Sequence, residues 1–210
     1  MTARIKICGL TRPKDVAAAI EYGADYLGFI VEAKSARRLN VKQAAHLALP
    51  TKDIVPTVAV TVNASNALLE AICDQMRPDY IQLHGDETPE RARDINERFG
   101  IKLIKALPIA APQDLAAISQ YDVDLTLLDA KPPKGAARGG HGTAFDWNIL
   151  RGAVLPETWM LAGGINPETA SRAASVTNAS ILDVSSGVES GPGIKDHAKL
   201  KALFEAVNSV

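Results

Sequence analysis

Ile5-Lys6-Ile7-Cys8-Gly9 is a β-forming run that stops at a glycine turn, and the same pattern recurs along the whole chain. Helical patterns such as Val16 to Ile20 and Leu68 to Ile72 separate one run from the next. Alternating strands and helices are typical of a parallel sheet covered by helices. The expected strands begin near Arg4, Tyr26, Thr57, Asp79, Lys102, Leu125, Thr158 and Ser180.

The number of these units predicts the fold. Eight strand-and-helix units close naturally into a (β/α)8 TIM barrel of the α/β class, and no linker divides residues 1–210, so we expect one domain. The strand runs are mostly apolar, as expected of strands buried on both faces. An open doubly wound sheet is the alternative, but residues 8–13 lack the G-x-G-x-x-G of dinucleotide-binding sheets.

Proline marks several expected helix starts. It is tolerated in the first helical turn because its missing N–H would have no partner there, and a preceding Thr or Asn can cap. The last helix is expected from about Asp196 to Val207. The four starts are Thr11-Arg12-Pro13, Thr88-Pro89-Glu90, Ala111-Pro112-Gln113 and Asn166-Pro167-Glu168.

Composition argues against several classes of partner. The 23 Lys and Arg nearly balance the 24 Asp and Glu, so we expect no nucleic acid partner. The longest apolar runs, such as Tyr26 to Val31, are too short to span a bilayer, and no targeting segment opens the chain. We therefore expect a cytoplasmic protein without a membrane partner.

The cysteines and histidines indicate neither a disulfide nor a metal site. Cys8 and Cys73 show no C-x-x-C spacing, and a cytoplasmic setting keeps thiols reduced. The four histidines lack the spacing of zinc ligands, so no metal is expected.

Cys8 and Asp129 each end an expected strand, where barrels carry their active residues. A buried thiol is more often a small core residue than a catalytic group. The alternative for Asp129 is capping, or pairing with Lys131 or Lys134. Surface charge is the alternative for Arg37, and hydrogen bonding to the backbone is the alternative for His84.

Two glycine-rich loops follow the seventh and eighth expected strands. Gly163 and Gly164 lie just past the first of these strands, and Ser185, Ser186 and Gly187 lie just past the second. Glycine lets backbone N–H groups approach an anion, and barrels commonly bind phosphate on these loops. We expect a phosphate site here, the alternative being two turns without a ligand.

The sequence resembles phosphoribosylanthranilate isomerases over nearly its whole length. Seven motifs in the same order as in that family carry the resemblance: Lys6-Ile7-Cys8-Gly9, Ser35-Ala36-Arg37, Gln82-Leu83-His84-Gly85-Asp86-Glu87, Leu128-Asp129, residues 139–147, Leu161-Ala162-Gly163-Gly164-Ile165 and residues 183–189.

The resemblance implies an Amadori rearrangement in tryptophan biosynthesis. N-(5′-phosphoribosyl)anthranilate would become 1-(2-carboxyphenylamino)-1-deoxyribulose 5-phosphate, with Cys8 as general base, Asp129 as general acid and no cofactor. The family resemblance further implies that Arg37 faces the anthranilate, and we expect substrate contacts from His84, Gly142 and Asp183. We expect a monomer or a homodimer.

The reaction needs a partly ionised thiol. An ordinary cysteine is only a few per cent thiolate at pH 7, so a modest lowering of the Cys8 pKa would be enough for a base. Lys6 is a candidate cause, because residues two apart on a strand share a face.

Three other functions are weighed against this one. The aminoaldose isomerase of histidine biosynthesis resembles a pattern with aspartates on strands one and five, where this chain has Cys8 and Ala106-Leu107-Pro108. Indole-3-glycerol-phosphate synthase carries lysine and glutamate positions that we do not find. A phosphate-binding barrel without catalysis is disfavoured because both Cys8 and Asp129 are present.

Overall fold

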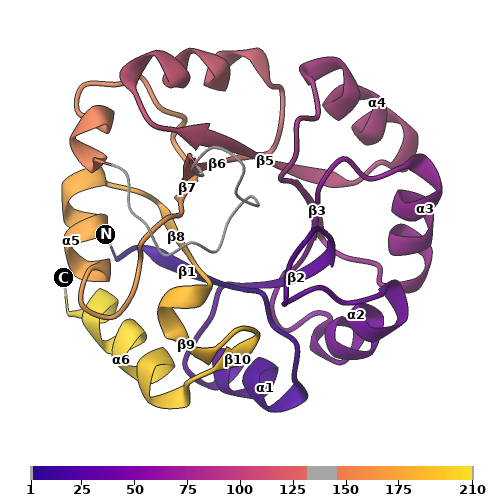
Figure 1. Cartoon of the computed structure of the whole chain (residues 1–210), viewed down its shortest axis with the longest axis horizontal. Coiled ribbons are helices and arrows are strands. Elements are labelled where there is room, and N and C mark those ends of the chain that lie inside the picture. The colour runs from indigo at the N-terminus through magenta and orange to yellow at the C-terminus, as the bar shows by residue number, and fades with distance from the viewer. Residues whose placement is uncertain (1, 132–145, 210) are drawn as a thin grey trace.

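The computed structural model describes residues 2–131 and 146–209, which form a closed parallel barrel ringed by helices (Figure 1). The strands are β1 (Arg4–Cys8), β2 (Tyr26–Glu32), β3 (Thr57–Thr61), β4 (Tyr80–Leu83), β5 (Lys102–Ile109), β6 (Leu125–Ala130), β7 (Trp159–Leu161) and β8 (Ile181–Val184). Each strand pairs in parallel with its neighbours in sequence order, and β1 closes the barrel against β8. The predicted (β/α)8 fold is confirmed.

The α-helices of the described chain are α1 (Pro13–Glu21), α2 (Val41–Ala48), α3 (Asn66–Gln75), α4 (Pro89–Phe99), α5 (Ala170–Thr177) and α6 (His197–Asn208). Four further segments of the described chain are 3-10 helices: η1 (Leu49–Thr51), η2 (Pro112–Gln120), η3 (Trp147–Leu150) and η4 (Ser186–Val188). We expected an amphipathic α-helix after every strand. This expectation is wrong after β5, where the 3-10 helix η2 follows. After β6, the helical segment among the described residues is the 3-10 helix η3.

Several boundaries differ slightly from the expected ones. Strands β4, β7 and β8 each begin one residue later than expected, and α6 begins after its cap, Asp196. Thr88 caps α4 as expected, by accepting a hydrogen bond from the N–H of Arg91 at 3.2 Å. Helix α5 begins only at Ala170, because the Asn166 side chain accepts from the next N–H groups and forms a turn before the helix.

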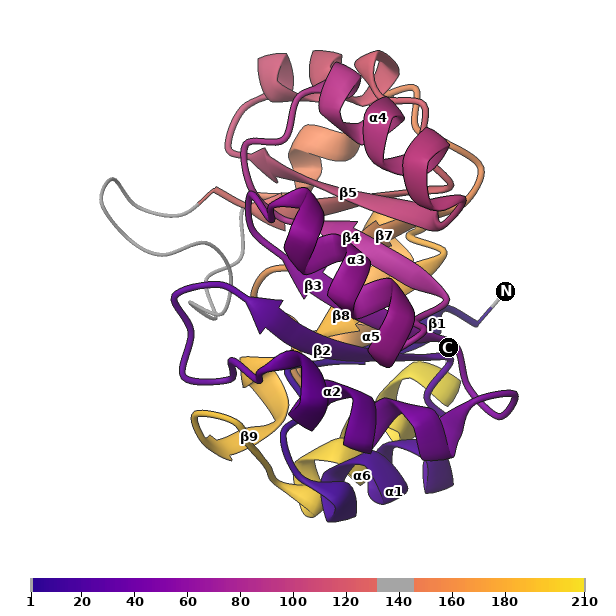
Figure 2. The same cartoon turned by 90° about the vertical axis from the view of Figure 1, so that its right-hand side faces the viewer.

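A hairpin that the sequence did not predict follows η4. Strands β9 (Glu189–Gly191) and β10 (Ile194–Lys195) pair antiparallel, at the end of the barrel toward which β2 points (Figure 2). The buried carboxylate of Asp15 on α1 holds the hairpin by accepting from the backbone N–H of Lys195 at 3.1 Å. The same carboxylate accepts from Arg12 and lies 2.9 Å from His197 Nε2.

The barrel interior is apolar near the amino ends of the strands and polar toward their carboxyl ends. The apolar layers gather alternate residues of the strands, among them Val58, Val60, Ile104, Leu125, Leu127, Met160 and Ile181. Tyr26 and Tyr80 pack edge to face, with ring centroids 5.9 Å apart. Lys6 of β1 alternates with the outward-facing Ile5 and Ile7, so its side chain enters the same interior.

We expect Leu127→Ala to lower the free energy of unfolding by about 2–5 kcal/mol, because the side chain is fully buried and its loss leaves a cavity. Equilibrium unfolding in urea measures this change. The matched control is Leu49→Ala, a side chain that is 43% exposed, for which the change should stay within about 0.5 kcal/mol. Equal losses in the two variants would contradict the assignment of Leu127 to the core.

Candidate active site

Cys8 ends β1 and faces the barrel interior, where it is 6% exposed. The neighbouring strand makes room for it at Gly28, where an added Cβ would lie 3.0 Å from Cys8 Sγ. Neither Cys8 nor Cys73 forms a disulfide. The thiol therefore lies free at the carboxyl end of the strands.

The pKa of Cys8 is raised above its ordinary value. Burial is the largest cause, and the carboxylate of Asp183 adds to it. The ammonium groups of Lys6 and Lys195 act in the opposite direction but do not outweigh burial. Lys6 therefore does favour the thiolate, as proposed from the sequence, but its effect does not produce a net lowering of the pKa. The expectation that Lys6 and Cys8 share a face is confirmed.

Lys6 is a fully buried cation that connects several strands. Its Nζ donates to Asp183 Oδ1 on β8 at 2.8 Å and to Gln82 Oε1 on β4 at 2.9 Å. Burial lowers the pKa of Lys6, but Asp183 and Cys8 together raise it above the ordinary value. A charged ammonium therefore lies beneath the thiol.

Asp129 lies near the end of β6, with its carboxylate 14% exposed. Its Oδ1 accepts from the N–H of Ala130 at 2.8 Å, and its Oδ2 lies 3.4 Å from His84 Nε2. His84 Nδ1 lies 2.8 Å from Gln82 Nε2, which connects Asp129 to the buried Lys6. Lys131, one alternative partner for Asp129, instead contacts Asp114 at 3.8 Å.

A buried ion pair supports the loop that carries His84. Lys105 donates to Glu87 Oε2 at 2.8 Å, and both side chains are at most 3% exposed. The Glu87 carboxylate also accepts from the N–H groups of Asn63 and Gly85, at 2.7 and 2.9 Å. These bonds hold the loops after β3 and β4 together.

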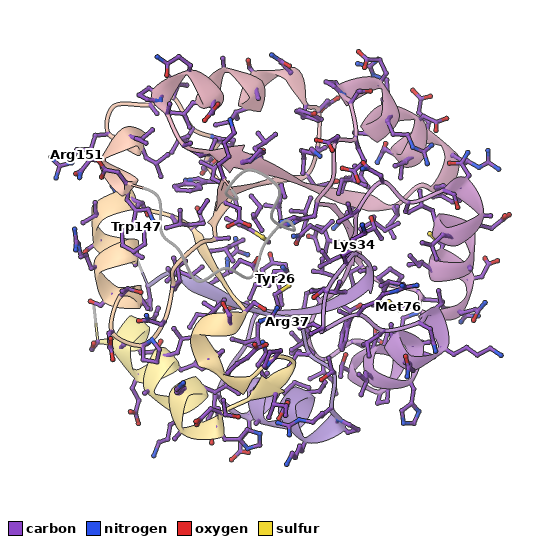
Figure 3. All side chains as sticks on the ribbon, in the orientation of Figure 1. Tyr26, Lys34, Arg37, Met76, Trp147 and Arg151 are labelled. Carbon is purple, nitrogen blue, oxygen red and sulfur yellow. The ribbon has the colours of Figure 1, made fainter. Side chains whose placement is uncertain are left out.

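Arg37 is held by Glu189 of the hairpin. Its Nε and Nη2 donate to the two carboxylate oxygens at 2.8 and 2.7 Å, which raises the Arg37 pKa. In the end-on view Arg37 lies close to the barrel centre (Figure 3). Lys195 also donates to Glu189 Oε1 at 2.9 Å, so one buried carboxylate pairs with two cations.

The two predicted phosphate loops pack against each other. A Cβ on Gly187 would overlap with the carbonyl oxygen of Ile165, so the loop after β8 lies directly on the loop after β7. Gly163 and Gly164 both have positive φ, 89° and 69°. Among the described residues, the N–H groups of these two glycines have no hydrogen-bond acceptor, as an anion site requires.

The structure brings most of the predicted site residues to the same end of the barrel. They are Cys8, Arg37, His84, Asp129, Gly163, Gly164, Asp183, Ser185, Ser186 and Gly187. Gly142 lies outside the described residues. The roles of all these residues are still predictions.

Sequence reasoning assigned no role to four residues that shape this site: Gly28, Gln82, Glu87 and Glu189. Gly28 interrupts an apolar strand, which is a signal of close approach by another group. The other three stand inside the quoted motifs, but each has a partner that is 24 to 152 residues away in sequence. Only the folded barrel brings these residues together, so a local sequence pattern cannot reveal the contacts.

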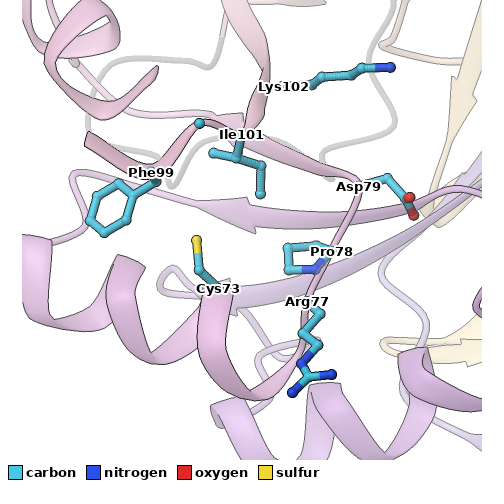
Figure 4. A pocket seen from close by; sticks show the side chains of 8 residues that line it. Cys73, Arg77, Pro78, Asp79, Phe99, Ile101 and Lys102 are labelled. Atoms are coloured by element: carbon cyan, nitrogen blue, oxygen red, sulfur yellow. The ribbon is translucent and has the colours of Figure 1, made fainter. Parts of the chain in front are cut away.

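A separate surface pocket of about 410 Å³ lies at the opposite end of the barrel, beside the residues that precede β4 and β5 (Figure 4). Cys73 and Phe99 line it, together with Asp79, whose carboxylate already accepts from the backbone N–H and the hydroxyl of Thr57. The active residues of such barrels lie at the other end, where the strands finish, so this pocket is not the expected active site.

Among residues 2–131 and 146–209, no three His, Cys, Asp or Glu side chains are grouped so that they could hold a metal ion. Within the same ranges, no helix is both long and apolar enough to cross a membrane.

Comparison with known proteins gives one consistent family. Residues 5–206 match the family model described as N-(5′-phosphoribosyl)anthranilate (PRA) isomerase. The enzyme of that name from Parvibaculum lavamentivorans is 46% identical over 98% of both chains. The structure of phosphoribosyl anthranilate isomerase from Thermotoga maritima superposes with a TM-score of 0.87 at 34% identity, over 99% of this chain and 100% of that one.

A further structure of a phosphoribosyl anthranilate isomerase was solved with reduced 1-(o-carboxyphenylamino)-1-deoxyribulose 5-phosphate. It superposes with a TM-score of 0.82 at 30% identity and covers 99% of this chain and 100% of its own.

The raised Cys8 pKa predicts how the alkylation of this thiol depends on pH. In a Cys73→Ser background, alkylation of native Cys8 should show a pH midpoint above that of the same protein unfolded in guanidinium, because the thiolate forms only at higher pH. Mass spectrometry of samples alkylated at a series of pH values measures both midpoints. A native midpoint at or below the unfolded one would contradict the dominance of burial.

Proposed function

The chain belongs to the N-(5′-phosphoribosyl)anthranilate isomerase family and is an isomerase of tryptophan biosynthesis, and we propose that Cys8 and Asp129 carry out its two proton transfers. The observation that supports this most directly is a continuous series of polar contacts, buried at Lys6 and Gln82 and half-buried at His84 and Asp129, between the two groups. It runs from Lys6, beneath the Cys8 thiol, through Gln82 and His84 to Asp129.

The proposed reaction opens with Asp129 as the acid. Asp129 gives a proton to the ring oxygen of the phosphoribosyl group, the bond from that oxygen to C1′ breaks, and the anthranilate nitrogen supplies the electron pair of the resulting iminium ion. The charge left on Asp129 develops beside His84, whose ring nitrogen lies 3.4 Å from Oδ2.

Cys8 then acts as the base. Its thiolate takes the proton from C2′, the electron pair moves to the iminium nitrogen, and an enolamine forms. Tautomerisation of the enolamine moves a proton from the C2′ hydroxyl to C1′ and gives the amino ketose. The steps balance without an external oxidant or reductant, so the chemistry requires no redox cofactor.

Lys6 increases the fraction of the Cys8 thiol that is ionised in this scheme. A thiol whose pKa is raised by burial is a strong base once ionised, but it is ionised less often. The Lys6 ammonium favours the thiolate and so recovers part of the ionised fraction. The thiol and the ammonium are thus a functional pair.

The substrate has two anionic ends, and groups on two sides of the barrel, at the carboxyl end of the strands, suit them. The N–H groups of Gly163 and Gly164, which have no acceptor within residues 2–131 and 146–209, suit the phosphate, and so does the loop of Ser185 to Gly187. Arg37 suits the anthranilate carboxylate, because Glu189 occupies only its Nε and Nη2. His84 and Asp183 complete the proposed contacts from the described chain.

The location and assembly of the enzyme are also proposals. A cytoplasmic location fits an enzyme of amino-acid biosynthesis. A monomer and a homodimer are both compatible with a site that one chain supplies.

We expect Cys8→Ser and Asp129→Asn each to lower kcat by about 10²- to 10⁴-fold with little change in KM, because each removes a proton-transfer group. Loss of phosphoribosylanthranilate fluorescence measures turnover. Cys73→Ser is the matched control and should keep full activity, since this thiol lies at the far end of the barrel. An inert wild type would refute the isomerase function, and near-full activity in both variants would refute the acid and base roles.

We expect Ser186→Asp to raise KM by about 10-fold or more, because a carboxylate near a bound phosphate repels it by a few kcal/mol at a partly exposed site. Inorganic phosphate should also become a weaker competitive inhibitor. Ser119→Asp on η2 adds the same charge at an exposed position away from the loops and should leave both constants unchanged. Equal behaviour of the two variants would argue against a phosphate at Ser186.

A further inference from the structure

Four side chains, from β1, β4, the residue that follows β4 and β6, form one polar series across the barrel interior. Lys6 Nζ donates to Gln82 Oε1 at 2.9 Å, Gln82 Nε2 lies 2.8 Å from His84 Nδ1, and His84 Nε2 lies 3.4 Å from Asp129 Oδ2. A branch leads from Lys6 to Asp183 Oδ1 at 2.8 Å. Lys6 and Gln82 are at most 1% exposed, so water cannot replace these partners.

The donor and acceptor properties of this series allow only one assignment. A lysine ammonium has donors and no acceptor, so the Gln82 atom facing Lys6 must be the carbonyl oxygen. The other end of the same amide is then the NH₂ group, which faces His84 Nδ1 as a donor. Nδ1 must accept, and the neutral imidazole therefore has its proton on Nε2.

We propose that Lys6 and Gln82 are positioning residues that fix His84 in the Nε2–H tautomer and so keep an N–H donor directed at Asp129 Oδ2. The proposal rests on the proposed acid role of Asp129. It adds to that role two residues that do not touch the acid, one of them 76 residues from its partner in sequence.

The orientation of Asp129 gives this donor its function. Because Oδ1 accepts from the N–H of Ala130, the carboxyl group presents Oδ2 to His84. Negative charge develops on the carboxyl group as it releases its proton, and an N–H donor stabilises that charge. The other tautomer would direct the lone pair of Nε2 at the same oxygen and oppose the charge. The 3.4 Å separation is of the kind that shortens when substrate is bound.

The first test measures the tautomer itself. In ¹⁵N-histidine-labelled enzyme, His84 should show a protonated Nε2 and an unprotonated Nδ1, with its signals identified by their loss in His84→Asn. In Gln82→Met, which removes the amide donor but keeps an unbranched side chain, the two nitrogens should move toward the averaged shifts of mixed tautomers. His46 is exposed and serves as an internal reference whose signals should stay unchanged.

The second test connects the tautomer to catalysis. Gln82→Met should lower kcat by about 10- to 100-fold, because the oriented donor is lost, with KM little changed. Gln120→Met on η2, at an exposed position, is the matched control and should keep full activity. In the Asp129→Asn background, Gln82→Met should cause no further loss, since the two changes act through one carboxylate.

The outcomes separate this proposal from the proposed function. A wild-type His84 protonated on Nδ1, unchanged His84 signals in Gln82→Met, or additive losses in the double variant would each overturn the positioning role. Full activity of Asp129→Asn would overturn the acid role instead, while the tautomer measurement would still decide whether Lys6 and Gln82 fix the imidazole.

Discussion

The ammonium of Lys6, buried without any exposed surface inside the barrel, is the group on which the site depends. An isolated buried charge would be too costly to retain, so its neighbours must satisfy it. Asp183 compensates the charge and Gln82 accepts a hydrogen bond. The Cys8 thiolate gains from the same ammonium. One cation therefore orients the amide of Gln82, favours the thiolate of Cys8 and, through His84, is connected to the carboxylate of Asp129.

The proposed base works against an unfavourable environment. The interior that excludes water from the reaction also disfavours the thiolate, and burial is the larger effect in the unliganded protein. Gly28 lets the sulfur lie against the backbone of β2, where Lys6 and Lys195 favour the thiolate but do not outweigh the burial. A site nearer to the solvent would ionise the thiol more easily, but it would expose the iminium intermediate to water.

The sequence was sufficient for the eight-stranded barrel and for the approximate starts of its strands, since glycine and proline mark the turns between them. It also indicated Cys8 and Asp129, because a polar residue after an apolar strand has few structural explanations. It did not reveal the partners of Lys6, which are 76 and 177 residues away. Nor did it reveal the direction of the Cys8 pKa, because that direction depends on the balance of burial and charge, and neither quantity is local.

Glu189 shows why the unpredicted hairpin matters to the same site. Its carboxylate accepts from Arg37, on the proposed anthranilate side, and from Lys195, which also donates to the carbonyl of Ser185 in the proposed phosphate loop. Gly9, with φ of +73°, lets Arg37 and the hydroxyl of Ser185 approach the end of β1 more closely than any Cβ would allow. The groups proposed to hold the two ends of the substrate thus share one buried carboxylate, and the hairpin supplies it.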